Sequence, residues 1–417
     1  MTNIATWIIA VFAVSGVIIR PWRVPESVWA MIGAIALVAF GLLPLRDALF
    51  AVGKGTDVYL FLAGMMLLSE LARREGLFDF LAAYAVNHAR GSAPRLFLLT
   101  YAIGTVVTVF MSNDATAVVL TPAVYAAARH ARANPLPYLF VCAFIANAAS
   151  FVLPISNPAN LVIFGAHMPP LRQWIAQFAL PSILAIAATW AVHRFLQRDA
   201  LTGTIDAEIT LPHLSRAGTT TGYGIVVVAV VLLGASFLGM PLGLPTFAVT
   251  SLVAAVVLIG KRETPWATLK GVSWGVLALV AGLFVLVQGL EHAGAVQALS
   301  AMLQSRTNAS ATGTAWGAGI VIAIACNLVN NLPLGLIAGA TITAFHAQTT
   351  IQSAVAIGID LGPNLSITGS LATILWLTAI RREGEHVSAW QFLRLGALVM
   401  PIALLFALAG LFITASL

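Results

Sequence analysis

Four groups of polar residues interrupt otherwise apolar stretches of this chain, and these are the residues that could bind a solute. They occupy 111–122, 147–160, 330–333 and 360–373. Their polar side chains are amides and hydroxyls together with two carboxylates, Asp114 and Asp360, and none of them is Lys or Arg. Polar groups in apolar surroundings are costly unless they meet a partner or water, so such clusters predict a functional site. This choice of groups favours hydrogen bonding to a small polar solute.

The first and third groups have the pattern of helical hairpin tips. Ser, Asn and Asp disfavour continued helix, and a good helical run resumes directly after Asp114. A helix start presents free backbone N–H groups and a positive dipole end, which helps to bind anionic or lone-pair-rich oxygens. In the third group two amides, Asn330 and Asn331, end one arm and Pro333 opens the next without losing a hydrogen bond.

The second and fourth groups predict discontinuous membrane spans, because Gly, Pro, Asn or Ser interrupts an apolar helix there. In lipid an irregular backbone is tolerated only where protein or a watery cavity satisfies it, so these breaks should meet at a shared central site. The candidate substrate-binding residues are Asn113, Thr116, Asn157, Asn160, Asn330, Asn331, Ser370 and Thr373. The candidate proton-coupling residues are Asp114 and Asp360, since burial favours the neutral form of a carboxyl group. The supporting candidates are Ser112, Asn147, Ser150 and Cys326.

Plainer roles are open for each of these residues. A single Asn, Ser or Thr can equally serve to join two helices, and Asp is an ordinary N-cap. Cys326 lies four residues before Asn330 on one helical face, where a thiol could touch a thiophilic substrate, but one thiol is a poor trap. Neither a metal-ligand set nor a nucleophile–base constellation is present, so we expect no cofactor and no catalysis.

The composition indicates that these groups lie within a membrane. Of 417 residues 60% are hydrophobic and 9% are charged, which excludes a soluble globule with a normally wetted surface. Apolar stretches near the roughly 20 residues that cross a bilayer recur throughout the chain. The formal charge of +6 comes from basic residues scattered between apolar runs, which argues against nucleic-acid binding. The two cysteines can form neither a disulfide framework nor a zinc cluster.

The apolar pattern predicts five crossings in the first half, one of them interrupted, and a re-entrant hairpin with arms at 95–111 and 115–130. The predicted crossings are 4–19, 26–43, 57–72, 137–166 (interrupted) and 173–193. The second half follows the same plan. With the N-terminus outside, all Lys and Arg residues fall on the cytoplasmic side, with the exceptions of Arg46, Lys54, Arg172 and Arg306. The positive-inside rule favours this orientation.

An internal repeat relates the two halves. AGMMLLSELARREG (63–76) aligns with AGLFVLVQGLEHAG (281–294), and the same displacement places Asn113 over Asn331. A second register places Asn147 over Asp360 and Asn157 over Ser370. Because five crossings is an odd number, the second copy must be inverted in the membrane, as in many secondary transporters.

The predicted fold is therefore an all-α polytopic membrane protein of two inverted-topology repeats. Each repeat has about five spanning helices, one of them discontinuous, and a re-entrant helical hairpin. The first repeat covers 1–196 and the second 221–417, with a solvated cytoplasmic linker at 197–220.

Four motifs resemble one transporter family over essentially the full chain. MSNDATAVVLTP, ISNPANLVIFG, VNNLP and GIDLGPNLSITGSLATILW closely resemble the arsenite and antimonite efflux permeases of the ArsB family, within the wider ion transporter superfamily. Asn364 is a departure, because the resemblance leads us to expect a basic residue there. The resemblance implies proton-driven export of trivalent arsenic or antimony hydroxide across the inner membrane, sometimes with a cytoplasmic ArsA-type ATPase as partner. A sodium/proton antiporter of the same superfamily and an arsenite uniporter energised by that ATPase are the alternatives.

Overall fold

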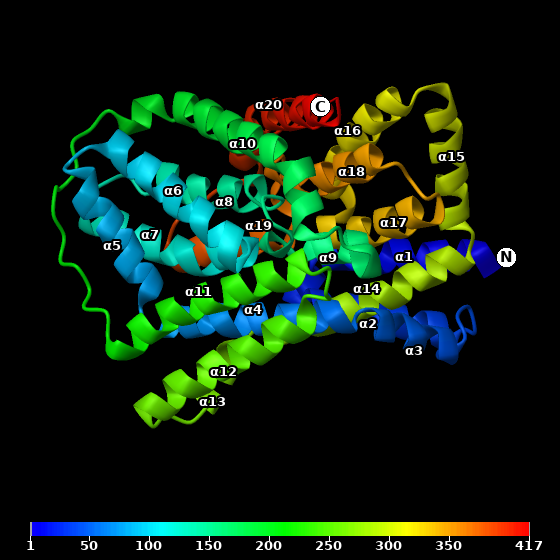
Figure 1. Ribbon diagram of the computed structural model, residues 1–417, viewed down its shortest axis with the longest axis horizontal. Helices are drawn as coiled ribbons and strands as arrows, with labels where there is room; N and C mark the ends of the chain where they lie inside the picture. Colours follow the sequence, from blue (N-terminus) through cyan, green and yellow to red (C-terminus); the bar gives the residue numbers. More distant parts are fainter. Residues whose placement is uncertain (1, 417) are drawn as a thin grey trace.

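The computed structural model describes residues 2–416, which form an all-helical molecule with no β-strand in that range (Figure 1). Within it, seven helices are long and apolar enough to cross a membrane, or eight if the pair α3 (Leu45–Lys54) and α4 (Thr56–Arg74), bent by 48°, forms one span. The seven are α6 (Ala93–Met111), α10 (Leu171–Leu196), α11 (Arg216–Phe237), α12 (Gly243–Lys261), α14 (Gly275–His292), α16 (Ala311–Val329) and α20 (Ala389–Ala415). This confirms the predicted polytopic helical fold.

Shorter helices complete the chain. The α-helices are α1 (Thr2–Ile19), α2 (Glu26–Ala39), α5 (Leu77–Ala89), α7 (Thr121–His130), α8 (Leu136–Ala148), α9 (Pro158–Phe164), α13 (Trp266–Gly271), α15 (Ala295–Ala309), α17 (Asn331–Ala344), α18 (Thr349–Leu361) and α19 (Leu371–Arg382). A π-helical segment, η2, covers Ala115–Leu120. The short 3₁₀ turns are η1 (Pro21–Arg23), η3 (Pro154–Ser156), η4 (Gly165–His167), η5 (Arg198–Leu201), η6 (Gly362–Asn364) and η7 (Ile367–Gly369).

The predicted breaks lie where helices are too short to span a bilayer. Both α8 and α18 have 13 residues, or about 20 Å at 1.5 Å per residue, against a hydrocarbon core of about 30 Å. The path continues through η3 into α9 in the first half and through η6 and η7 into α19 in the second. The interruptions account for two predicted crossings that are not single long helices, while α1 and α2, predicted to cross at 4–19 and 26–43, are also short. Conversely, α6 and α16 are long enough to cross a membrane, although they occupy the positions predicted for hairpin arms.

The two hairpins have the same construction. Both α6 and α16 have 19 residues and begin after a serine N-cap, Ser92 or Ser310, whose Oγ accepts a backbone N–H of the first turn. Each ends at a non-glycine residue with positive φ, Ser112 at 93° and Asn330 at 75°. Ser92 and Ser310, and likewise Ser112 and Asn330, are separated by the same displacement that aligns 63–76 with 281–294. The inverted topology of the two halves stays a prediction.

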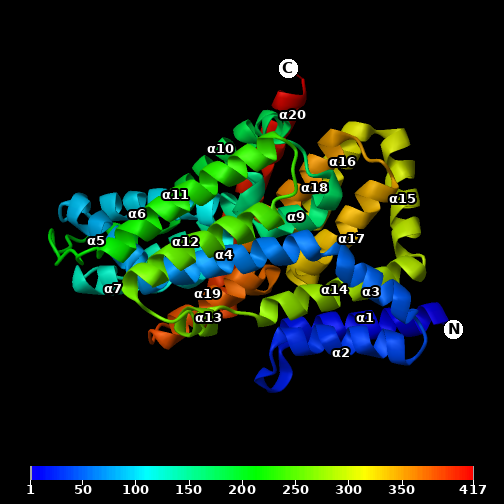
Figure 2. The ribbon, with the colours of Figure 1, turned by 60° about the horizontal axis from the view of Figure 1, so that its bottom comes forward.

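Helices from the two halves pack against one another instead of forming separate bodies. Helix α4 lies along α12 and α2 packs against α14 (Figure 2), and α10 packs against α20. The fully buried indole of Trp376 in α19 donates to the Leu139 carbonyl oxygen in α8, at 2.9 Å. The centre of the molecule is therefore built by both halves together.

The segment predicted as a solvated linker is docked on the first half. Helix α11 already begins at Arg216, and the chain before it runs past α5 (Figure 1). The backbone N–H groups of Ile205 and Asp206 donate to carbonyl oxygens of the α5–α6 and α7–α8 connections, at 3.1 and 2.9 Å. The Asn87 side chain exchanges two hydrogen bonds with the backbone of Ile209. Most side chains of 197–220 are exposed or half-buried, and these backbone hydrogen bonds attach part of the segment to the first half. Its role as a cytoplasmic linker stays a prediction.

Candidate functional site

A small cavity lies where the two hairpin tips and the two broken spans meet. It encloses about 290 Å³ of empty space, its open side included. Helices α9, α17, α14 and α4, which come together at the centre of Figure 1, contribute to its walls. The lining residues are Leu62, Asn113, Asp114, Asn157, Pro158, Val276, Asn331, Leu332, Ser370, Leu371 and Ala372.

The cavity is lined chiefly by helix starts. Apart from Leu62 in α4 and Val276 in α14, its described lining residues lie at the beginnings of η2, α9, α17 and α19. Each helix start carries a partial positive charge and free backbone N–H groups. No Lys or Arg is among the described lining residues, and Asp114 is their one carboxylate. The arrangement therefore offers donors to oxygen-rich solutes without a cationic side chain.

The first hairpin tip presents Asn113 and Asp114. The sharp turn at Ser112, with φ 93° and ψ 159°, ends α6 and directs the next two residues to the cavity. The Asn113 Oδ1 atom is buried without a hydrogen-bond partner. The half-buried Asp114 carboxylate has no hydrogen-bond partner in the described part of the chain and does not cap η2. The alternative that Asp114 is an ordinary N-cap is therefore wrong.

The following segment is π-helical, a rare conformation that is frequently found at functional sites. Its winding turns Thr116 away from the cavity. The Thr116 hydroxyl lies 2.8 Å from the Thr108 hydroxyl and 3.4 Å from the Gly104 carbonyl oxygen, both in α6. Thr116 thus joins the two arms of the first hairpin instead of lining the cavity.

At the second hairpin tip, Asn330 and Asn331 have different surroundings. The Asn330 side chain accepts from the Leu332 N–H at 3.4 Å and donates to the Thr368 carbonyl oxygen at 3.2 Å, which ties the tip to η7. Asn331, 3% exposed, lines the cavity. Asn331 is therefore the amide of this tip that lines the cavity, and Asn330 holds the tip against η7.

Each broken span begins its second helix with a side-chain cap that also lines the cavity. The Asn157 Oδ1 accepts from the Ala159 N–H at 2.9 Å, and the Ser370 Oγ accepts from the Thr373 N–H at 3.1 Å. Asn157 Nδ2 also donates to Asp360 Oδ1 at 2.5 Å. Asp360 is fully buried, and its other oxygen, Oδ2, has no hydrogen-bond partner among the described residues. It therefore stands behind Asn157, outside the cavity lining.

The remaining predicted residues of the breaks form a buried network behind the lining. Asn147 Nδ2 donates to the Thr373 hydroxyl at 3.4 Å, and that hydroxyl lies 2.8 Å from Ser370 Oγ. Asn160 Nδ2 donates to the Ser150 carbonyl oxygen at 2.9 Å, which closes the first break on itself. Their positions shape the breaks, and the structure does not bring them to the cavity.

Cys326 does not face the cavity either. Its fully buried thiol points to the Gly358 and Ile359 carbonyl oxygens of α18, at 3.9 and 3.7 Å. The idea that this thiol touches a thiophilic substrate is therefore wrong for this arrangement. The helical face shared with Asn330 packs against α18.

Three polar residues of this region were missed as site residues. Asn364 is fully buried; its Oδ1 accepts from Asn147 and its Nδ2 donates to the Phe144 carbonyl oxygen, each at 3.0 Å. An amide thus joins α8 to η6 where the resemblance led us to expect a basic residue. Asn327 accepts from Ser366 at 2.7 Å and donates to the Gly362 carbonyl oxygen at 3.0 Å. Ser156 Oγ likewise donates to the Val109 carbonyl oxygen in α6. Ser156 and Asn364 lie within the polar groups 147–160 and 360–373, and this position could have identified them from the sequence.

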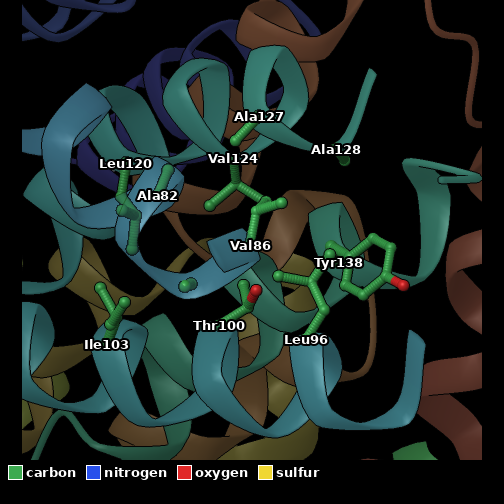
Figure 3. Close-up of a pocket in the computed structure, with 11 residues that line it drawn as sticks. Ala82, Val86, Leu96, Thr100, Ile103, Leu120, Val124, Ala127, Ala128 and Tyr138 are labelled. Atoms are coloured by element: carbon green, nitrogen blue, oxygen red, sulfur yellow. The ribbon is translucent and has the colours of Figure 1, made fainter. Parts of the chain in front are cut away.

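A second pocket, shown in Figure 3, lies inside the first hairpin and has different chemistry. Residues of α5, α6, α7 and α8 line it, and most of them are alanine, valine, leucine or isoleucine. Its polar groups are the Thr100 hydroxyl and the Tyr138 hydroxyl, and the latter donates to the Ala93 carbonyl oxygen. This apolar pocket is apart from the polar cavity and lacks its donors.

Comparison with known proteins assigns the chain to a protein family. The profile of the CitMHS family, described as citrate transporter, matches residues 7–363. The chain belongs to the CitMHS family. This CitMHS protein is 28% identical over 355 residues to an arsenical pump membrane protein of Yersinia enterocolitica, covering 82% of each chain. It is 26% identical over 389 residues to an Escherichia coli protein of the same name, covering 90% of each. These relatives confirm the resemblance seen in the sequence.

Solved structures support the fold. The Alcanivorax borkumensis YdaH transporter aligns with a TM-score of 0.60 at 15% identity, covering 88% of this chain and 87% of that one. Neisseria gonorrhoeae MtrF, from a class of antimetabolite efflux pumps, aligns with a TM-score of 0.54 at 13% identity, covering 91% and 84%. The protein is thus a multi-pass membrane transporter of the CitMHS family and not an enzyme.

Proposed function

We propose that this protein exports trivalent arsenic or antimony hydroxide from the cytoplasm in exchange for protons. The observation that carries the proposal is the cavity lining, in which the amides of Asn113, Asn157 and Asn331 and the hydroxyl of Ser370 surround one carboxylate, Asp114. Arsenous acid is a small neutral trihydroxide near neutral pH, so its hydroxyls can donate to the carboxylate and accept from amides and helix starts. The names of the relatives support the same substrate class.

The family description raises citrate as a second substrate class, and the cavity argues against it. A citrate anion carries several negative charges and would meet the Asp114 carboxylate. Helix starts attract anions, but the described lining offers no Lys or Arg to neutralise a multiply charged one. A neutral hydroxide avoids this repulsion. Citrate at high excess should therefore fail to compete with arsenite for transport.

Exchange of a neutral solute for protons makes transport sensitive to two gradients. One proton entering for each hydroxide leaving moves one positive charge inward, so both the membrane potential and the pH gradient drive export. The candidate proton carriers are Asp114 and Asp360, the carboxylates of the four clusters. In this proposal the protein lies in the inner membrane with its N-terminus outside.

Everted membrane vesicles test the proposal directly. A pH gradient, acidic inside the vesicle, should drive accumulation of arsenite or antimonite in vesicles with the protein and not in vesicles without it. Collapse of the gradient by a protonophore should abolish the accumulation. Accumulation that persists under the protonophore and needs only ATP with a cytoplasmic ATPase would instead identify an energised uniporter.

A sodium/proton antiporter is the second candidate, favoured by the buried oxygens near the site. Asn113, Asn147 and Asn160 each leave a buried Oδ1 without a hydrogen-bond partner, and hard cations prefer oxygen ligands. Addition of NaCl to vesicles with an established pH gradient decides between the functions. Sodium-dependent loss of the gradient without arsenite transport would replace metalloid export by sodium/proton exchange.

A further inference from the structure

The two aspartates of the site lie in opposite surroundings. Asp114 is half-buried, lines the cavity and immediately precedes the first residue of η2. Asp360 is fully buried, stands outside the cavity lining and lies one residue before the end of α18. A carboxylate is favoured at a helix start and disfavoured at a helix end, where carbonyl groups carry partial negative charge. The two side chains are therefore suited to different tasks.

Few charged groups act on either side chain. Neither carboxylate forms an ion pair with a described residue, and the titratable group of the described chain that acts on Asp360 is the Cys326 thiol of α16. No such neighbour is recorded for Asp114 from the elements packed against η2. The difference between the two positions comes from access to the cavity and from helix geometry, not from nearby ion pairs.

The hydrogen bonds of Asn157 indicate that Asp360 holds the Asn157 amide in one orientation. The Asn157 Oδ1 is held by the Ala159 N–H, and one hydrogen of its Nδ2 is held by Asp360. An amide nitrogen carries two hydrogens, so one donor of Asn157 is left for the cavity that this residue lines. Asp360 and Ala159 hold the nitrogen and the oxygen of the amide, so together they oppose its rotation.

We propose that Asp360 is a positioning residue that fixes the Asn157 donor toward the substrate, and that Asp114 alone exchanges the proton. This inference rests on the proposed function. On the cytoplasmic side Asp114 releases its proton to water and its carboxylate then accepts a hydrogen bond from a substrate hydroxyl. On the outer side the substrate leaves and Asp114 takes up a proton. Proton and substrate compete for the same oxygen lone pairs, which links one proton inward to one neutral hydroxide outward.

Three variants separate the roles in everted vesicles. Asp114→Asn should abolish gradient-driven arsenite accumulation while downhill flux remains. Asp360→Asn keeps an oxygen that accepts from Asn157, so it should retain the wild-type pH profile with little change in apparent KM. Asp360→Ala removes that acceptor and should raise the apparent KM by about tenfold, with accumulation still driven by the gradient. Asp199→Asn, which changes an exposed carboxylate on η5, is the matched control and should behave as wild type.

The opposite pattern would overturn the inference. If Asp360→Asn lost the response to the pH gradient but kept downhill flux, or if Asp114→Asn kept gradient-driven accumulation, the assignment would be wrong. If the wild-type protein moved neither metalloid, the proposed function would fail instead, and the infrared titration, which needs no substrate, would decide which aspartate takes up the proton.

A second measurement does not need the substrate and also excludes misfolding. Infrared difference spectra of purified protein, taken between mildly acidic and mildly alkaline buffer, should show a carboxyl C=O band that titrates in wild type. The band should be present in Asp360→Asn and absent in Asp114→Asn, with both variants eluting as monodisperse species from size exclusion. Loss of the band in Asp360→Asn alone would assign the proton to Asp360.

Discussion

Ser112 and Asn330 hold the same unusual backbone conformation at the two hairpin tips, with φ of 93° and 75°. For a residue other than glycine such a conformation costs roughly 1–3 kcal/mol, and it persists only where the surroundings impose it. The side chains differ, because Asn330 makes one hydrogen bond within the tip and one to η7, whereas the Ser112 side chain makes none within the described part of the chain. Backbone strain is thus common to both tips, and the side chain compensates at one of them.

This contrast gives a prediction for a matched pair of glycine variants. Ser112→Gly should raise the free energy of unfolding by about 1 kcal/mol, since relief of strain exceeds the added entropy of the unfolded chain. Asn330→Gly gains the same relief but loses two hydrogen bonds worth about 1 kcal/mol each, so it should not stabilise the protein. Thermal unfolding in detergent measures both. Equal stabilisation by the two substitutions would contradict this account.

A second residue-scale prediction separates a cavity amide from a support residue. Asn113→Ala should raise the apparent KM for arsenite, because it removes a lining amide, with little change in stability. Thr116→Ala should leave the apparent KM unchanged and lower the free energy of unfolding by about 1 kcal/mol, because its hydroxyl joins η2 to α6. Vesicle kinetics and thermal unfolding are compared for each variant. A KM effect for Thr116→Ala alone would reverse these assignments.

The types of residue at the breaks predicted much of the cavity lining. Their spacing along the chain did not predict which side chains face the cavity. Asn113, Asp114, Asn157, Asn331 and Ser370 were all predicted as site residues and lie together in the lining. Thr116, expected two residues beyond Asp114 to join them, instead faces α6. The reason is the π-helical winding of η2, which changes the direction of successive side chains and leaves no simple mark in the sequence. Their roles in transport stay predictions.

At the scale of elements, glycines set how closely the first broken span approaches the second hairpin. A Cβ added to Gly339 in α17 would lie 2.5 Å from the Ile163 carbonyl oxygen in α9, whereas one added to Gly335 would meet nothing nearer than 3.5 Å. The two positions are one turn apart on the same helix. The close approach at Gly339 therefore holds α9 and α17 at the distance that shapes the cavity.

Alanine at these two positions should have opposite effects. Gly339→Ala must push α17 from α9, so it should lower both stability and the maximal transport rate. Gly335→Ala should be neutral or stabilise by up to about 1 kcal/mol, because alanine is the better helix former. Thermal unfolding and arsenite flux check the pair. Wild-type flux in Gly339→Ala would show that the spacing of the two helices is not critical.

Local sequence signals predicted the breaks and hairpins but not what joins them. Proline, asparagine and glycine within apolar runs mark the ends of α8 and α18, because they disfavour continued helix. The linker around Ile205 was expected to be solvated from its polar composition, and that composition gave no sign that the Ile205 N–H donates to the Gly91 carbonyl oxygen. Backbone pairing between distant segments depends on tertiary proximity, which composition does not encode.

At the scale of the whole molecule, the proposed exchange predicts an electrogenic transporter. With the pH equal on both sides, a potassium diffusion potential set by valinomycin, positive inside everted vesicles, should drive arsenite accumulation, because each cycle carries one positive charge out of the vesicle. Reversal of the potential should drive arsenite out of preloaded vesicles. A flux that ignores the potential would indicate that a charge-balancing ion or a charged substrate moves in the same cycle.

The buried hydrogen bond between Asn147 and Asn364 also has a consequence for synthesis, since its partners are 217 residues apart in the chain. At about 5–20 residues per second, a ribosome needs roughly 10–40 s to make the second partner after the first. Throughout that interval the Asn147 amide, on a helix too short to span the bilayer, lacks its final partner. The centre of the molecule therefore cannot be completed until residue 364 is made, so the first half must persist in the membrane as an intermediate for that time.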